Sequence, residues 1–570
     1  MPATMKPKPW EADEAASICS HSTQASTGDK SRPPEEDDPL LPKGSCETAN
    51  VVKVADLGPL AWLRELVKQF GFELMALLFV VQHVLKGLVF SFTGQAESYL
   101  FRAYGVAAPQ MQIYAGVAGL PWAMKPIIGL VSDVLPVCGY NKSPYMLLTT
   151  VLGTIALACL AFLTEDTMSI RVAIICLFLA QLQISTCDLL SEAKYAEKVR
   201  EHPAYGPALL SYVWFGLQVG GLIAVVGCGH IIHEYGPRAC FLLCLLPAAS
   251  VFIPVALGYL QEGRMSREEI SEACARVWQQ REACILCFVM LIGTLTLVIC
   301  GIVTGDAFTN CVVAIAVAVV VLAAFSLFLS PVIAKFNAFS LIQTSLNLSM
   351  AGAAYYFFTD SPEEYPEGPH FSEFFFVSVM GTAGAVFSLV GIAAYQRYLS
   401  NWKYRNLLIL TNLIYAGLSC FDLLLFTRMN VKLGIPDHVF VLSCTVLGSV
   451  LNQWRWMPGV VINSHLCPKG MEATMYALLA GCHNLGNMIA ASCGAWMLEL
   501  LRCKPHGAHN ESKQFENLWM MSGLTTLLPL LTIVLLFWLI PNARQNEPLE
   551  GVDRSDATNG SIWRTYISGT

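Results

Sequence analysis

The stretch from Pro121 to Lys142, PWAMKPIIGLVSDVLPVCGYNK, decides the fold. It begins within a long apolar run and holds Asp133 just past the apolar end. A second apolar run starts at Ser143. This order is typical of two membrane helices joined by a tight, charged turn. A partial copy of the stretch recurs far downstream, and that copy determines the expected architecture.

The composition is that of a membrane protein. Of the 570 residues, 55% are hydrophobic and 14% charged, whereas soluble domains carry roughly 25% charged residues. The net charge of -7 and the lack of a basic cluster argue against nucleic acid as a partner. The 20 cysteines stand singly in apolar runs, so we interpret them as buried thiols. No metal and no cofactor is expected.

Fourteen apolar runs are long enough to cross a bilayer, which takes about 20 helical residues each. Lys and Arg gather in the turns on the side of the N-terminus, and such turns stay in the cytoplasm. We therefore expect an all-α polytopic membrane protein with both termini cytoplasmic. The predicted spans are 71–95, 108–131, 143–163, 168–191, 207–230, 236–260, 283–304, 309–333, 335–358, 372–396, 405–426, 437–462, 471–500 and 517–540.

An internal repeat organises these spans. A shift of 262 residues lays Gly129 on Gly391 and Tyr140 on Trp402, and six spans then match six others. The spans 283–304 and 309–333 fall between the copies as an extra pair. Proteins of the major facilitator superfamily consist of two such halves. The substrate site lies between them near the membrane midplane, and the halves rock about it during transport. The expected parts are a disordered cytoplasmic tail (1–57), a six-helix bundle (58–260), a linker with the extra pair (261–334), a second six-helix bundle (335–541) and a cytoplasmic tail (542–570).

Several motifs resemble the folate-biopterin transporter family, a branch of that superfamily, and are closest to its protozoan members. One departure is that a lone Lys142 follows Asn141, where the family often has consecutive basic residues. The resemblance covers about 70–540 and implies transport of a folate or pteridine. It rests on Pro121-Trp122, Lys125-Pro126, Gly129, Ser132-Asp133, Gly139-Tyr140 and Pro144-Tyr145, on Asp188 with Glu192 to Ala196, and on Met457 to Gly459, Cys467 to Thr474 and Ala477 to Gly486.

Polar residues within spans of the first half are site candidates, because a charge at mid-membrane costs ~2.5 to 3.5 kcal/mol and usually faces a cavity. Gln82, Lys86 and Glu97 are expected to share a stripe facing the central cavity; alternatively, Lys86 and Glu97 reach opposite membrane surfaces. In the fourth span, Gln181 and Asp188 share a face with Glu192. Asp188 is the first candidate to bind substrate or carry a proton; alternatively, it pairs with Lys194.

The second half offers a corresponding set. Arg455, three residues after Asn452, could hold the carboxylates of a folate, or it could neutralise Asp188 or Asp422. His483 and Asn487 share a stripe with Tyr476. His483 is a candidate proton carrier, although a lone membrane histidine is more often a packing residue.

Aromatic side chains complete the predicted substrate site. Trp214 with Gln218, and Tyr355 beyond Asn347, could stack a pterin ring or cage a methylated cation. Choline and S-adenosylmethionine are therefore alternative substrates.

The remaining expectations concern coupling, gating and location. We expect a monomeric importer in the plasma membrane that works by alternating access with proton symport. A non-transporting nutrient receptor is the alternative of another class. An enzyme is not expected, since GxSxG, HExxH and P-loop motifs are absent. The candidates are Asp188, Glu97 and Asp422 for proton coupling, Asp133, Lys142, Arg397 and Arg405 for gating, and Asn510 of Asn510-Glu511-Ser512 for glycosylation.

Overall fold

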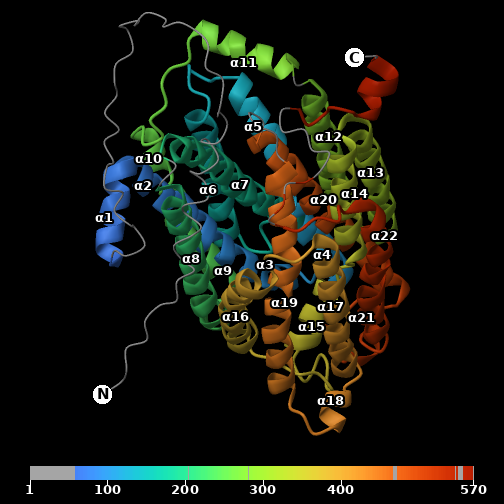
Figure 1. The fold of residues 1–570 in the computed structure, drawn as a ribbon. Coiled ribbons are helices and arrows are strands. Elements are labelled where there is room, and N and C mark those ends of the chain that lie inside the picture. The colour runs from blue at the N-terminus through green and yellow to red at the C-terminus, as the bar shows by residue number, and fades with distance from the viewer. Residues whose placement is uncertain are drawn as a thin grey trace, which may run out of the picture. The chain divides into compact units, whose positions relative to one another are not determined.

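The computed structural model describes residues 58–202, 205–279, 281–466, 472–545, 547, 549 and 556–568. The expected tail 1–57 and the motif residues 467–471 lie outside this part of the chain. The described residues form helices, with only two isolated β-bridges. Figure 1 shows the long helices running alongside one another, with α11 lying across their ends.

The first half contains α1 to α10. Their bounds are α1 Pro59–Phe70, α2 Phe72–Leu78, η3 Phe79–Val89, α3 Phe90–Ala103, α4 Ala108–Gly119, η4 Leu120–Trp122, α5 Lys125–Val134, α6 Ser143–Phe162, α7 Ile170–Glu201, α8 Gly206–Tyr235, α9 Pro237–Ala249 and α10 Phe252–Ala256.

The linker helix and the extra pair follow, and then the second half. Their bounds are α11 Arg267–Gln279, α12 Arg281–Val303, α13 Ala307–Phe328, α14 Pro331–Leu346, α15 Ala351–Thr359, η6 Phe374–Val379, α16 Met380–Ala394, η7 Tyr395–Leu399, α17 Tyr404–Phe426, α18 Met429–Lys432, α19 Asp437–Leu466, α20 Glu472–Leu500, η8 Ser512–Gln514, α21 Leu518–Leu527, η9 Leu528–Leu530, α22 Leu531–Leu539 and η10 Trp563–Ser568.

Eleven helices of the described chain are long and apolar enough to cross a membrane, and each coincides with a predicted span. The other three predicted spans are helical but do not meet both conditions. The span 335–358 is divided into α14 and α15, 437–462 lies in the more polar α19, and 471–500 lies in α20. The count of fourteen therefore stays a prediction.

The break between α14 and α15 falls at Asn347–Met350, inside an apolar run. Backbone groups freed at this depth need partners from the protein. The Gln112 side-chain amide, from α4, donates to the carbonyls of Ser349 and Ala491, both at 3.0 Å. A Cβ atom on Gly494 would overlap the Ser349 carbonyl oxygen. The two halves thus meet at the break through one glutamine.

The turn at the end of the opening stretch is held by the segment that follows α10. Glu262 accepts hydrogen bonds from the backbone N–H groups of Lys142 and Ser143, both at 2.9 Å. The N–H of Met265 donates to the carbonyl of Gly139 at 2.9 Å. Glu262 therefore caps the start of α6, while the gating candidate Asp133 is exposed near the end of α5.

The second half holds its corresponding turn in a similar way. The N–H of Tyr404 donates to the Ala543 carbonyl at 3.1 Å, and Arg405 Nε donates to the Ile540 carbonyl at 2.7 Å. Both acceptors, Ile540 and Ala543, follow the end of α22. Arg397, also a gating candidate, lies 5.7 Å from the ring centroid of its neighbour Tyr398. The repeat therefore extends from helices to the contacts that hold their turns.

We expect the Glu262→Gln substitution to loosen the turn before α6. A lost helix cap costs about 1 kcal/mol, which corresponds to roughly fivefold faster amide exchange. Hydrogen exchange of the peptide containing Lys142 and Ser143 measures this directly. The matched control is Glu268→Gln on the exposed face of α11; equal exchange in both variants would contradict the capping role.

The extra helix pair contacts both halves, and the end of the chain packs onto it. α12 lies against α4, α5 and α20, and α13 against α14 and α20. Ser330, after α13, donates its N–H to the Ala557 carbonyl at 2.9 Å. Arg564 Nε lies 3.5 Å from Oε1 of the buried Glu282 on α12. The described part of the predicted tail 542–570 thus packs on the helices.

Candidate functional site

A buried ionic cluster occupies the first half. Asp188 on α7 has no exposed side-chain surface. Its Oδ1 lies 2.7 Å from Lys86 Nζ and its Oδ2 lies 2.6 Å from Lys125 Nζ. Gln82 Nε2 donates to Oδ1 at 2.9 Å. Glu192, one turn further, lies 3.7 Å from Lys86 and 3.5 Å from Lys125. Two lysines and two carboxylates therefore balance each other's charge around the fully buried Asp188, with Glu192 on the partly exposed side of the cluster.

Helix geometry brings the cluster together. The π-helix η3 carries Gln82 and Lys86 on adjacent turns, and π-turns often mark functional sites. Lys125 starts α5 after the short turn η4 and is followed by Pro126, which suits a first helical turn. The alternative partner for Asp188 is engaged elsewhere, since Lys194 Nζ lies 3.2 Å from Glu197.

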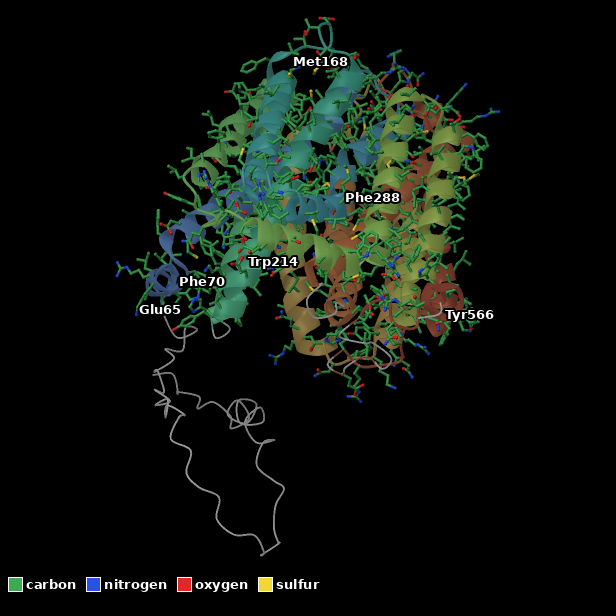
Figure 2. The ribbon with its side chains drawn as sticks, turned by 90° about the horizontal axis from the view of Figure 1, so that it is seen from above. Glu65, Phe70, Met168, Trp214, Phe288 and Tyr566 are labelled. Carbon is green, nitrogen blue, oxygen red and sulfur yellow. The ribbon has the colours of Figure 1, made fainter. Side chains whose placement is uncertain are left out.

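Two indole rings lie beside the lysines. Lys125 Nζ is 4.8 Å from the ring centroid of Trp122, and Lys86 Nζ is 5.8 Å from that of Trp214. Trp122 also donates its indole N–H to Gln181 Oε1 at 3.0 Å. Trp214, labelled in Figure 2, is 57% exposed on α8. The rings stabilise the ammonium groups and offer flat surface beside them.

A cavity of about 290 Å³ lies in the second half, between α14, α17, α19 and α20. It brings together five predicted site residues that are far apart in the sequence. They are Asn347, Asn452, Arg455, His483 and Asn487. Further lining residues include Phe336, Phe339, Gln343, Trp456, Asn463 and Tyr476.

The cavity offers one fixed positive charge among polar amides and aromatic rings. Arg455 is the only Lys or Arg among the described residues that line it. Its guanidinium lies 4.1 Å from the ring centroid of Tyr415, and its Nε donates no hydrogen bond to the described residues. Neither Asp188 nor Asp422 is within ion-pair distance of Arg455 in the described structure. The arginine is therefore positioned to bind a ligand carboxylate by charge-assisted hydrogen bonds.

His483 lies on the same wall of the cavity. Its Nδ1 is 3.0 Å from Thr344 Oγ1, and its ring meets that of Trp456 edge to face at 4.9 Å. These contacts fix the imidazole with Nε2 as its second polar atom. Rings and amides in this arrangement suit a flat heteroaromatic ligand.

The ionic cluster and the cavity lie close together across the two halves. Asn484, next to His483, donates its side-chain amide to the Trp122 carbonyl at 3.4 Å. Tyr195, on the α7 helix that carries the cluster carboxylates, is close enough to Glu192 and to Tyr476 of the cavity to interact with both electrostatically. One ligand could therefore reach both halves.

The other predicted site residues lie outside the cavity lining. Gln218 is exposed on α8. Tyr355 packs against Tyr99, with ring centroids 5.1 Å apart. Glu97 has a buried Oε1 that accepts no hydrogen bond from the described chain, and Asp422 is half-buried on α17.

Sequence reasoning gave too little weight to three groups. Lys125 was expected only to meet a substrate leaving for the cytoplasm, and not to pair with Asp188, although a lysine followed by proline in an apolar run was a usable signal. Trp456 and Asn463 gave no separate signal, because one is an ordinary membrane aromatic and the other lies near a helix end. The described residues contain no group of three or more His, Cys, Asp or Glu arranged to hold a metal ion.

Comparison with known proteins adds independent information. A model of the BT1 family matches residues 86–558. The chain is 26% identical over 475 residues to a folate-biopterin transporter of Synechocystis sp., covering 81% of each. It is 24% identical over 512 residues to probable folate-biopterin transporter 2 of Arabidopsis thaliana, covering 88% of this chain and 89% of the relative. Folate transporter 2 of Plasmodium falciparum is 23% identical, with 80% of this chain and 86% of the relative covered.

Solved structures share the fold. A POT peptide transporter in complex with sulfate superposes with a TM-score of 0.57 at 13% identity, covering 83% of this chain and 97% of the other. A D-xylose-proton symporter gives a TM-score of 0.52 at 12% identity, covering 83% and 98%. At this identity the match shows the architecture alone, which is that of major facilitator transporters.

Proposed function

The chain belongs to the BT1 family, and on that premise we propose that it imports a folate or another pteridine by alternating access. The observation that carries the proposal is the cavity around Arg455. Its rings and amides suit the pterin, and its guanidinium suits a carboxylate. The names of the relatives support the same substrate class.

In this proposal the two halves of the protein have different roles in transport. The second half binds the flat ring system beside Trp456 and His483. The first half presents Lys86 and Lys125, each already balanced by a carboxylate. Rocking of 58–260 against 335–541 then exposes the ligand to either side of the membrane. A substrate carboxylate that approaches the lysines would compete with Asp188 and Glu192, which links binding to a rearrangement.

The cavity favours an anionic substrate over the alternative of a methylated cation. A quaternary ammonium beside Arg455 would be repelled by the guanidinium, and no carboxylate is among the described lining residues. Choline and S-adenosylmethionine should therefore not be transported, and they serve as negative controls.

The proposal also includes that transport is coupled to proton symport and that the protein is a monomer. Of the carboxylates within the membrane spans, Glu97 is a better candidate than Asp188 to carry the coupled proton. The Glu97 Oε1 atom is buried and accepts no hydrogen bond from described residues, whereas Asp188 already contacts two ammonium groups.

Transport into proteoliposomes tests the function. Labelled folate, biopterin, choline and S-adenosylmethionine are compared at two external pH values, with the membrane potential clamped. We expect uptake of the two pteridines only, faster at the lower pH. Uptake of choline in preference to both pteridines would overturn the substrate class. Uptake that ignores the pH step and a protonophore would overturn symport.

We also propose a plasma-membrane location with both termini in the cytoplasm. The loop 501–517 then faces outward and exposes Asn510. Expression in a glycosylating eukaryotic cell should give a protein whose gel mobility increases after glycosidase treatment, and Asn510→Gln should remove that change. Asn141→Gln, in a turn that this topology places inside, is the control. Loss of the mobility change in the Asn141 variant instead would reverse the topology.

A further inference from the structure

The described ion pairs that join the two halves gather on one side of the molecule. Arg102, at the end of α3, lies 3.0 Å from Asp360 and 2.6 Å from Glu364. His233, near the end of α8, lies 3.0 Å from Glu373. All three carboxylates belong to the segment between α15 and α16, on the side predicted to face outward. The halves are therefore closed against each other on that side.

Asp360 is the anomalous member of this group. Its side chain has no exposed surface, and neither carboxylate oxygen accepts a hydrogen bond from the described residues. Its contact with Arg102 is a charge contact at 3.0 Å. Arg102 gives its hydrogen bonds to Glu364 and to the Thr359 hydroxyl instead. A buried carboxylate without hydrogen bonds is costly in its charged form.

Carboxylates outnumber cations around Asp360. Glu364 lies on its own segment, and Glu511 approaches from the 501–517 loop, where it contacts His506 at 2.7 Å. The His370 ring contacts the backbone carbonyl of Asp360, not its carboxylate. Arg102 also lies 5.5 Å from the ring centroid of Tyr356 and near the phenol of Tyr355. Arg102 contacts Asp360 and Glu364, and Glu511 adds a third negative charge near Asp360, so a proton on Asp360 relieves the excess charge.

We propose that Asp360 is a proton-binding site, occupied when the two halves close on the outer side. Closure moves the carboxylate from water into the interface beside Glu364 and Glu511. Opening returns it to water, where the proton leaves. The site is separate from the coupling candidates in the membrane, and it rests on the fold and on the inter-half contacts, not on the substrate.

The sign of the pH effect follows from burial. Burial and the neighbouring carboxylates raise the pKa of Asp360 and Arg102 lowers it, and the net result is a pKa of about 7. In the open state the solvated group returns to about 3.9. The closed state binds the proton more tightly, so closure is favoured as the pH falls below about 7. The ratio of closed to open molecules should rise by about tenfold for each pH unit down to roughly pH 4, and should be constant above about pH 8.

Amide exchange at Ala108 reports this equilibrium. Its N–H donates across the halves to the Pro505 carbonyl at 2.9 Å, and that bond breaks when the outer side opens. Hydrogen–deuterium exchange of the full chain in nanodiscs is measured between pH 5 and 8, without substrate, and corrected for the intrinsic exchange rate. We expect protection of the Ala108 peptide to rise by about tenfold per pH unit below pH 7. Protection that does not depend on pH would overturn the proposal.

Substitutions test whether Asp360 is the residue that causes the pH dependence of Ala108 protection. Asp360→Asn carries no titrating proton, so its protection should be high and independent of pH. Asp437→Asn is the matched control, because Asp437 pairs with Arg428 within the second half, and should keep the wild-type dependence. Glu364→Gln should move the midpoint to lower pH, because one neighbouring negative charge is gone. Unchanged pH dependence in both Asp360→Asn and Glu364→Gln would overturn the assignment. Since no substrate is present, the result is independent of the proposed transport function.

Discussion

Uptake should fall by at least about 100-fold when Asp188 is replaced by Asn. The substitution leaves Lys86 and Lys125 with only Glu192, at 3.7 and 3.5 Å, in a buried cluster that was neutral. Removing one partner of a buried ion pair costs about 3–5 kcal/mol, of which about 2.7 kcal/mol corresponds to a 100-fold effect. Initial uptake rates of labelled folate in proteoliposomes, normalised to protein content, measure the loss.

A double variant separates stability from transport. Asp188→Asn with Lys125→Met removes one charge of each sign and leaves Lys86 paired with Glu192. We expect it to regain thermal stability in detergent but not uptake. Recovery of uptake together with stability would mean that the cluster only supports the fold. Wild-type uptake by the single variant would remove Asp188 from the site.

Replacing Arg455 by Gln should separate two substrates. Charge-assisted hydrogen bonds contribute about 1.5–3 kcal/mol, so folate binding should weaken by roughly 10- to 150-fold. Biopterin has no carboxylate and should lose less than about fivefold. Equilibrium binding of both ligands to the purified chain gives the ratio.

The control for this substitution keeps the charge. Arg455→Lys retains a cation but loses the planar fork and the contact over Tyr415. We expect it to bind folate with intermediate affinity. If Arg455→Gln weakens the binding of folate and biopterin equally, the guanidinium shapes the cavity but does not bind the folate carboxylate.

Much of the architecture could be predicted because apolar runs are long and continuous. The repeat was visible because Gly129 and Gly391 keep their spacing from the turns that follow them. Spacing along one helix also predicted which residues share a face, as with Tyr476, His483 and Asn487 in the cavity. These features depend on local order in the chain.

Contacts between helices could not be predicted in the same way. Lys125 and Asp188 are 63 residues apart, and no periodicity relates two helices to each other. The break at Asn347–Met350 was hidden because the residues around it are apolar, while the partners that permit it, Gln112 and Ala490, lie in distant helices. Tyr355 was assigned to the ligand because its helix was expected to be continuous with Asn347, and the break gives it different neighbours.

The docked end of the chain limits how the protein can be engineered. Hydropathy alone would suggest that everything after 541 is dispensable and that a purification tag belongs there. Deleting it would remove Gln545, which donates to the Leu399 carbonyl at 2.8 Å, and Arg564, the described partner of Glu282 from outside its own helix. A shortened chain would thus lose support for a turn of the second half and expose a buried acid on the extra pair. Fusions should leave residues 543–568 intact.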